Sequence, residues 1–276
     1  MNSLMVFKSL KEYTAYKNSS EYAEPNVSMI ETSGDVYIDG TLYEGKMPDF
    51  VFSPLVLVNE SGIVSDTAFY NEIAKLTIPS KIESLSAGAF QLTNIEEITL
   101  PANITSIGNM AFYKCHNLKK ITILGNVKEI PAQAFMMTNA GNSKLSEVNL
   151  PNSVTAIGNN AFEWCKSLKS FNFPSGIKTI GKNAFRSCES LEMIDLPASV
   201  TTINNAAFGQ TYSEAQQTMA LKTVICRATT PPTLGTSVFT SVVENIYVPD
   251  GSVNSYKSAT NWSTYADKIK GISEMQ

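Results

Sequence analysis

The sequence has few of the residues that usually carry catalysis or metal binding. Its 276 residues include one histidine and four cysteines, and 17% are charged, below the usual quarter. So few cysteines in a chain of this length do not predict a disulfide scaffold. The net charge is −4 and there is no basic block, so we expect no electrostatic recruitment to nucleic acid or anionic membranes. No apolar run approaches 18 residues, so no transmembrane segment is predicted.

The N-terminal sequence MNSLMVFKSLKEY lacks the features of a secretory signal peptide. It has neither a long apolar region nor a small-residue cleavage site. Two interpretations remain open: a cytoplasmic protein, or the mature region of an exported protein placed behind a new methionine.

What the sequence does contain is an internal repeat. An Ala-Phe pair recurs at 68–69, 89–90, 111–112, 134–135, 161–162, 184–185 and 207–208, and Val238-Phe239 varies it. Each phenylalanine is followed by an apolar triple of the form L-x-x-L-x-L. The triples are Ile73/Leu76/Ile78, Ile95/Ile98/Leu100, Leu118/Ile121/Ile123, Leu145/Val148/Leu150, Leu168/Phe171/Phe173, Leu191/Ile194/Leu196, Leu221/Val224/Cys226 and Val243/Ile246/Val248.

This repeat predicts a solenoid, because one coil of this length cannot bury its apolar side alone. The alternating end of each triple predicts a short strand. A second apolar pair before each Ala-Phe, such as Ile104/Ile107, predicts another brief extended or turn segment. Asparagines before Ala-Phe, such as Asn159, predict a short helical turn there. The predicted fold is a right-handed α/β leucine-rich repeat solenoid with short strands on one face, short helical turns on the other and a cap at each end.

A glycine follows the second apolar pair in three coils, at Gly108, Gly158 and Gly181. Pro131 occupies the same place once, so the position need not be left-handed in every coil. Because no phosphate-binding glycine pattern accompanies these residues, we interpret them as bend residues.

The stretch LPNSVTAIGNNAFEWCKSL, residues 150–168, resembles the BspA-like class of bacterial leucine-rich repeats. The degenerate TTPPTLGTSVF and the ending IYVPDGSVNSYKSATNW resemble the closing segment of gut-bacterial members. The resemblance implies secreted or cell-surface proteins tied to adhesion and to binding of host or matrix partners. It implies no catalytic residues.

The four cysteines fall at inward-facing places of the repeat. Cys115, Cys165 and Cys188 each come three residues after the repeat phenylalanine, where Thr93 stands in another coil, and Cys226 ends an apolar triple. We therefore favour buried structural thiols. A Cys165–Cys188 bridge between neighbouring coils and a reactive or metal-bound thiol remain the alternatives.

His116 directly follows Cys115 but is expected to point outward or sideways, away from the sulfur. It is the only histidine, and no C-x-x-C pattern accompanies it, so zinc would have too few ligands. The carboxylates lack the paired inward setting of a glycosidase, and no serine has a histidine in a triad pattern. We expect neither an enzyme nor a bound metal or cofactor.

Opposite charges follow one another from strand to strand of the repeat. Glu96 and Lys119 form one such pair, and Lys169, Glu192, Lys222 and Glu244 form a longer series. They predict ion pairs between neighbouring strands, each worth a fraction of a kcal/mol.

Two coils are longer than the rest at the same place. The interval from phenylalanine to triple grows from 6 residues to 10 after Phe135 and to 13 after Phe208. Both insertions should leave the same edge of the solenoid, which is often its binding side, although loop drift would look the same. The candidate partner-binding residues are Met137, Asn139, Asn142, Lys144, Gln210, Tyr212, Glu214, Gln217 and the outward aromatic Tyr247.

The two ends differ from the repeat. Residues 1–54 are predicted to be an N-terminal cap containing a hairpin at VYIDGTLYEG, residues 55–248 the solenoid, and residues 249–276 a helical C-terminal cap with Trp262 as an anchor. We expect a non-catalytic extracellular or cell-surface binding protein for a protein or glycan partner. A structural spacer in a larger surface assembly is the alternative, and an enzyme is the least favoured.

Overall fold

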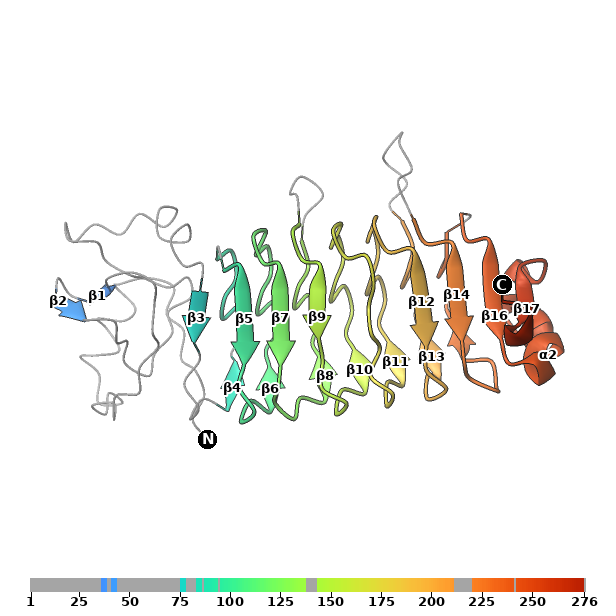
Figure 1. The fold of residues 1–276 in the computed structure, drawn as a ribbon, viewed down its shortest axis with the longest axis horizontal. Helices are drawn as coiled ribbons and strands as arrows, with labels where there is room; N and C mark the ends of the chain where they lie inside the picture. The colour runs from blue at the N-terminus through green and yellow to red at the C-terminus, as the bar shows by residue number, and fades with distance from the viewer. Residues whose placement is uncertain are drawn as a thin grey trace.

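The structure is a computed structural model that describes residues 83–85, 87–93, 95–137, 143–210, 220–240 and 242–275. It also describes the backbone of 36–38, 41–43 and 75–77. In these ranges the chain winds into a parallel-strand β-solenoid of about seven coils, as the repeat predicted (Figure 1). The right-handed sense of the winding stays a prediction.

One side of the solenoid, which we call the long-strand face, carries two four-stranded parallel sheets. The strand orders are β3-β5-β7-β9 and β12-β14-β16-β17, and all of these strands pair in parallel. Each apolar triple supplies one strand except the triple beginning at Leu168. The strands are β3 (Lys75–Thr77), β5 (Glu97–Leu100), β7 (Lys120–Ile123), β9 (Glu147–Asn149), β12 (Met193–Leu196), β14 (Thr223–Cys226), β16 (Asn245–Val248) and β17 (Ile269–Gly271).

The opposite side, the short-strand face, is built from the second apolar pair of each coil. Its strands form a pair, β4-β6, and a five-stranded parallel sheet, β8-β10-β11-β13-β15. They are β4 (Ser84–Leu85), β6 (Ser106–Ile107), β8 (Glu129–Ile130), β10 (Ala156–Ile157), β11 (Thr179–Ile180), β13 (Thr202–Ile203) and β15 (Thr233–Leu234). Short strands therefore line both faces.

The Ala-Phe segments, which we call the Phe corner, differ from the prediction. Where the sequence predicted short helical turns, the described residues form tight turns such as that closed by the Ala111 N–H on the Gly108 carbonyl. The Phe112 N–H donates 2.8 Å to the Ala134 carbonyl of the next coil, and other coils repeat this bond. A backbone N–H used between coils is not available to close a helix.

The Phe corner has a left-handed residue two residues before each described phenylalanine, and in four coils a second one two residues after it, at Leu92, Lys114, Trp164 and Ser187. The φ of the residue before the phenylalanine is positive in all seven described coils, between 52° and 67°, at Gly88, Met110, Gln133, Asn160, Asn183, Ala206 and Ser237. Gly158 and Gly181, two residues earlier, do not share this conformation. A Cβ on Gly181 would instead lie 2.5 Å from the Gly158 carbonyl carbon. Glycine is therefore needed here for the close approach of two coils.

The core is a single apolar interior that runs the length of the described solenoid. The repeat phenylalanines stack along it, with ring centroids 5.1–5.9 Å apart. Six of them, Phe90, Phe112, Phe135, Phe162, Phe185 and Phe208, are at most 1% exposed. For the described coils, the inward position of the triples and of the Ala-Phe pairs is thus confirmed, with Leu150 and Phe173 only partly buried.

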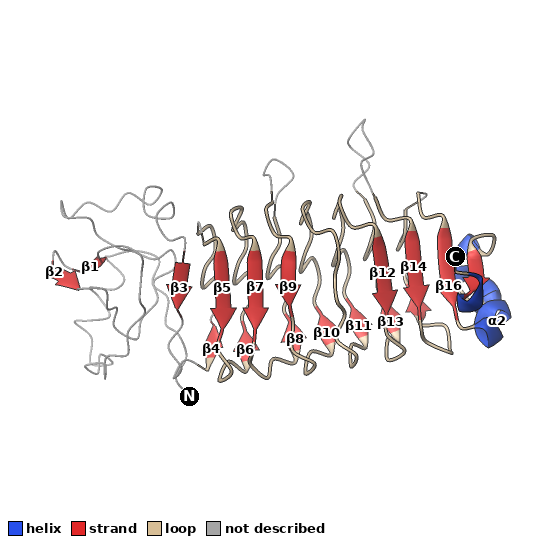
Figure 2. Cartoon of the chain, viewed as in Figure 1, coloured by secondary structure: helices blue, strands red, loops and turns tan. Residues whose placement is uncertain are grey.

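The C-terminal segment packs on the last coil and satisfies its backbone with side chains. The indole of Trp262, which is fully buried, donates to the Pro232 carbonyl at 2.7 Å, and the Asn261 amide donates to Leu234. This segment contains η2 (Asp250–Ser252), α2 (Val253–Ser258), η3 (Trp262–Tyr265) and η4 (Ile272–Glu274). Among the described residues, helices occur only here (Figure 2).

At the other end, the predicted hairpin is confirmed. Strand β1 (Val36–Ile38) pairs antiparallel with β2 (Thr41–Tyr43). The rest of residues 1–54 lies outside the described residues.

Candidate functional site

The thiols, which were the first candidates for chemistry, are buried in the interior. All four cysteines are free, and Cys115, Cys165 and Cys188 have no exposed surface. Each of these three thiols donates to the phenylalanine carbonyl of the preceding coil, at 2.9 Å for Cys115 and 3.2 Å for the other two. Thr93 makes the same type of bond through its hydroxyl, to Phe90 in its own coil. The position therefore favours a small side chain that can donate a hydrogen bond.

Burial also makes these thiols unreactive. Desolvation raises the pKa of Cys115 to about 11 and raises the pKa of Cys165, Cys188 and Cys226 as well. Because the thiolate is the nucleophile and the metal ligand, a thiol with a raised pKa is a poor candidate for either role.

His116 lies beside Cys115 in sequence but does not bond to its sulfur, which donates to Phe90 and lies 3.5 Å from the Thr93 hydroxyl. Burial, and secondarily Lys114, lowers the pKa of His116. Within the ranges given above, no three His, Cys, Asp or Glu side chains group as metal ligands would. The same ranges contain no helix of the length and apolarity that crossing a membrane requires.

The outward side chains of the long-strand face pair with one another. Lys119 donates to Glu96 at 2.8 Å, as predicted, and Lys222 lies 2.9 Å from Glu244. The predicted pairings of Lys169 with Glu192 and of Glu192 with Lys222 are absent from the ion pairs of the described residues. Two further pairs were not predicted: Lys120 with Glu147 at 2.7 Å, and a two-bond contact of Arg227 with Asp195.

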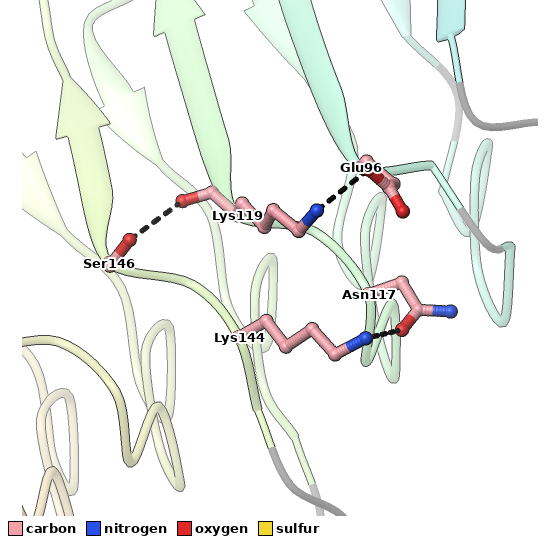
Figure 3. A network of polar contacts seen from close by, with 5 residues as sticks. All are labelled: Glu96, Asn117, Lys119, Lys144 and Ser146. Carbon is pink, nitrogen blue, oxygen red and sulfur yellow. Dashed lines mark hydrogen bonds and ion pairs between the residues drawn. The ribbon is translucent and has the colours of Figure 1, made fainter.

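The edge that carries the insertions begins beside this face. Lys144 reaches the Asn117 side-chain oxygen at 2.6 Å, next to the Lys119–Glu96 pair (Figure 3). The Lys144 N–H donates to the His116 carbonyl, and the Ala220 N–H donates to the Glu189 carbonyl. His116 and Glu189 are both the fourth residue after a repeat phenylalanine. Both long segments therefore rejoin the solenoid at the same place in the coil.

The predicted binding residues differ in how far they are exposed to solvent. Lys144 is exposed and Gln210 is partly exposed. Met137 is fully buried in the core, so its side chain cannot contact a partner, and we leave it out of the candidate surface. The remaining residues of the two insertions, Asn139, Asn142, Tyr212, Glu214 and Gln217, lie outside the described residues.

Tyr247 lies on the outward side of β16, but only 8% of it is exposed. Its neighbours across the sheet are Ile225, 3% exposed, and Lys270. The C-terminal end of the long-strand face is thus less accessible than the alternation of the strand predicted.

Sequence reasoning missed a polar cluster at the Phe corner. Glu163 is 0% exposed and accepts hydrogen bonds from Arg186 of the next coil and from Asn160. Beside it, Lys166 lies 5.2 Å from the centre of the Trp164 ring and 2.9 Å from Glu189. The residue after each repeat phenylalanine varies in type from coil to coil, so no periodic signal marked these residues. The cluster fixes neighbouring coils to each other.

Comparison with known proteins identifies the repeat. The family described as BspA type leucine rich repeat region matches in six copies, over residues 52–141 and 139–224. No curated protein matches the chain.

Three solved structures are similar to it. A leucine-rich repeat protein from Bacteroides ovatus ATCC 8483 is 22% identical, with a TM-score of 0.53 over 66% of this chain and 44% of that one. One from Eubacterium ventriosum ATCC 27560 is 31% identical, with a TM-score of 0.45 over 52% of this chain and 39% of that one. The T. pallidum leucine rich repeat protein is 22% identical, with a TM-score of 0.45 over 71% of this chain and 93% of that one.

The chain spans less than half the length of the first two structures, and the first of them shares its fold. The family match covers more than half of the 276 residues. With its repeats, buried phenylalanine stack and parallel strands, the chain belongs to the BspA-type leucine-rich repeat family.

Proposed function

We propose that the protein is a non-catalytic scaffold at the cell surface or outside the cell, which binds a protein or glycan partner along the edge that carries the two insertions. The observation that carries this proposal is the shared anchoring of both segments. Lys144 and Ala220 rejoin the solenoid on equivalent carbonyls, His116 and Glu189. Two segments anchored in one row can contact one partner together, so that weak contacts add up.

The chemistry of the described side chains supports a scaffold over an enzyme. The thiols are buried with raised pKa values, and three of them donate to a carbonyl of the preceding coil. The carboxylate of Glu163, the buried acid of the polar cluster, is held by Arg186. These groups stabilise neighbouring coils, which is a structural role.

The extracellular location rests on membership of the BspA-type family, whose resemblance implies secreted or surface proteins. The free thiols are buried, so they are compatible with an oxidising compartment, although they do not favour one. Protease treatment of intact cells of the source bacterium, followed by detection of the protein, tests the location. Loss of the protein from intact cells would support it, and full protection would contradict it.

A structural spacer is the second candidate, and one observation favours it. The long-strand face carries four outward ion pairs, and in each of them the charges of two neighbouring strands neutralise one another. Such a face has few unpaired charges to offer a partner, and it would suit a segment that only extends an assembly.

Binding assays on two shortened variants distinguish binder from spacer. One variant lacks residues 139–142 and the other lacks 212–217, and each is tested on immobilised host matrix proteins and a glycan array. The matched control is Thr179→Ser with Thr202→Ser on the short-strand face, which keeps both insertions. We expect the shortened variants to lose binding while the control retains it. Binding that survives both deletions would refute the role of this edge, and no binding by the intact chain would favour the spacer.

A further inference from the structure

The long-strand face is interrupted once within the described solenoid. Strand β9 pairs with β7, and β12 pairs with β14, but neither pairs with the coil that lies between them. We call residues 168–174 of that coil the seam. In Figure 1 the yellow chain between β9 and β12 carries no arrow on this face.

Backbone hydrogen bonds define the seam sharply. In four other coils, two successive N–H groups at the start of the strand share one carbonyl of the preceding coil. Lys119 and Lys120 donate to Glu96 in this way, Ser146 and Glu147 to Lys119, Lys222 and Thr223 to Glu192, and Glu244 and Asn245 to Lys222.

The equivalent bonds are missing on both sides of the seam. Among the backbone hydrogen bonds of the described residues, the Ser146 carbonyl accepts none from the N–H groups of Lys169 and Ser170. The Lys169 carbonyl likewise accepts none from the N–H groups of Glu192 and Met193. The side chains of Lys169 and Glu192 also form none of the ion pairs found there, whereas the equivalent Glu96–Lys119 and Lys222–Glu244 pairs do form. The missing backbone hydrogen bonds distinguish this coil, because the Glu192–Lys222 ion pair is also absent from the described chain between β12 and β14, whose backbones do pair.

The apolar residues of the seam give a physical cause. Phe171 stands where the other described coils have isoleucine or valine, such as Ile121 in β7. Its ring centre is 5.1 Å from that of Phe162 and 4.7 Å from that of Phe185, in edge-to-face contact with both. Phe173 packs on Phe171 at 4.8 Å. A phenyl ring reaches further than a β-branched side chain, and we infer that this extra size keeps the segment from pairing with its neighbours.

Other links across the seam remain intact. The five-stranded sheet of the short-strand face runs through this coil as β10-β11-β13. At the Phe corner, the Phe162 N–H donates to the Ala184 carbonyl at 2.8 Å. The two halves of the solenoid are therefore hydrogen-bonded to each other on the short-strand face and at the Phe corner, but not between strands of the long-strand face.

We propose that the seam is a hinge built into the solenoid. The blocks carrying β5-β7-β9 and β12-β14-β16 bend against each other about the short-strand face, and the bend changes the curvature of the long-strand face. This inference concerns motion of the scaffold and holds whether or not the insertion edge binds a partner.

Hydrogen exchange of the intact chain tests the hinge directly. Amides 169–173, together with Glu192 and Met193, should exchange on the order of 100-fold faster than those of β7 and β14, because they lack the bonds that protect a strand. Protection at the seam within about threefold of that in β7 would overturn the proposal.

A double variant tests the cause. Phe171→Ile with Phe173→Leu installs the residues of neighbouring coils, and it should slow exchange at 169–173 toward the β7 rate. The matched control, Ile194→Val, changes a core residue of the next coil and should leave the seam unchanged. A folded double variant with unchanged exchange at the seam would overturn the proposal. Should the double variant not fold, the exchange comparison in the intact chain still decides.

Spin labels measure the bending itself. Labels at Glu97→Cys and Thr223→Cys span the seam on the long-strand face, about 24 Å apart for five strand spacings. Labels at Glu129→Cys and Thr233→Cys span the short-strand face, about 19 Å apart for four spacings. The native thiols are buried and should not label. We expect a broad distance distribution for the first pair and a narrow one for the second, and equal widths would contradict a hinge.

Discussion

The Phe corner and the long-strand face are built from the same coils, yet they tolerate variation very differently. At the Phe corner, the repeat rings are stacked and buried in every described coil, and the backbone passes through the same left-handed position each time. On the long-strand face, the outward residues change between Glu97, Lys120, Glu147 and Met193, and one coil loses its strand entirely.

The difference follows from what each region contacts. A ring in the Phe corner touches the rings of the coils before and after it, so a change in one coil affects three. An outward side chain of a strand touches water and a neighbour with which its interaction is weak. The residues of the Phe corner therefore determine the fold, whereas the outward residues of the long-strand face can change from coil to coil.

The largest expected effect comes from removing one corner ring. Phe162→Ala should lower the free energy of unfolding by about 3–5 kcal/mol, since the ring is fully buried and neighbouring coils hold the cavity open. Met193→Ala, at a side chain that is 50% exposed, should stay within about 0.5 kcal/mol. Chemical denaturation followed by circular dichroism compares the two. Similar losses from both would contradict the contrast between the two regions.

The second effect is a loss of stability at alkaline pH. Burial raises the pKa of Cys115 from 9.0 to about 11, so the unfolded chain releases this proton first. The free energy of unfolding should therefore fall between about pH 9 and pH 11, by about 1.4 kcal/mol per pH unit for this thiol. Denaturation across this range in the wild type and in Cys115→Ser measures it. The serine variant should lose stability less steeply, and identical slopes would exclude this thiol as a cause.

The third effect tests the close approach of two coils. A methyl group on Gly181 would lie 2.5 Å from the Gly158 backbone, so Gly181→Ala should cost about 1–3 kcal/mol. Gly251→Ala is the matched control, because nothing lies within 4 Å of its added Cβ. Melting temperatures of the two variants give the comparison. A Gly181 variant as stable as the control would mean that the coils separate without cost.

The fourth effect concerns the hydrogen bond of the corner thiol. Cys188→Ala removes the donor that reaches the Phe162 carbonyl and should cost about 1 kcal/mol. Cys188→Ser keeps a donor in the same place and should cost less than the alanine variant. Equal stability of the two variants would show that the position selects for size alone.

The sequence predicted the parts of the fold that repeat. The regular recurrence of the Ala-Phe pairs and the apolar triples predicted the solenoid, the buried rings and the inward thiols. It could do so because the same contact between neighbouring coils is repeated in every coil. It missed the turns of the Phe corner, because asparagines such as Asn159 and Asn205 suggested helix caps. In the structure their side-chain oxygens accept the N–H of Lys182 and Thr236 in the next coil.

The site was less predictable, since its residues do not recur. Lys144 was found from the extra length of its coil, but Met137 in the same stretch is fully buried, although the equivalent Leu92 is exposed and Lys114 is partly exposed. The Glu163–Arg186 pair joins two coils through residues that are different in every other coil. An ion pair between two coils depends on the distance between them, and that distance cannot be read from the sequence of one repeat. The missing strand at residues 168–174 was not predicted either, because Phe171 fits the apolar pattern although it is larger than the isoleucine or valine of the other described coils.

The smallest effect is expected from the outward ion pair of Lys120 and Glu147. The hydrogen bond from Lys120 lowers the pKa of Glu147, so any stabilisation is present at neutral pH and is lost as the pH falls and the carboxylate is protonated. Both side chains are more than 40% exposed, where salt and water weaken the attraction. Lys120→Ala with Glu147→Ala should therefore leave the melting temperature unchanged at physiological salt, and unchanged again at pH 4. A loss as large as that of Gly181→Ala would mean that the strand face constrains the fold as the corner does, and then its variable residues would not be free to serve a partner.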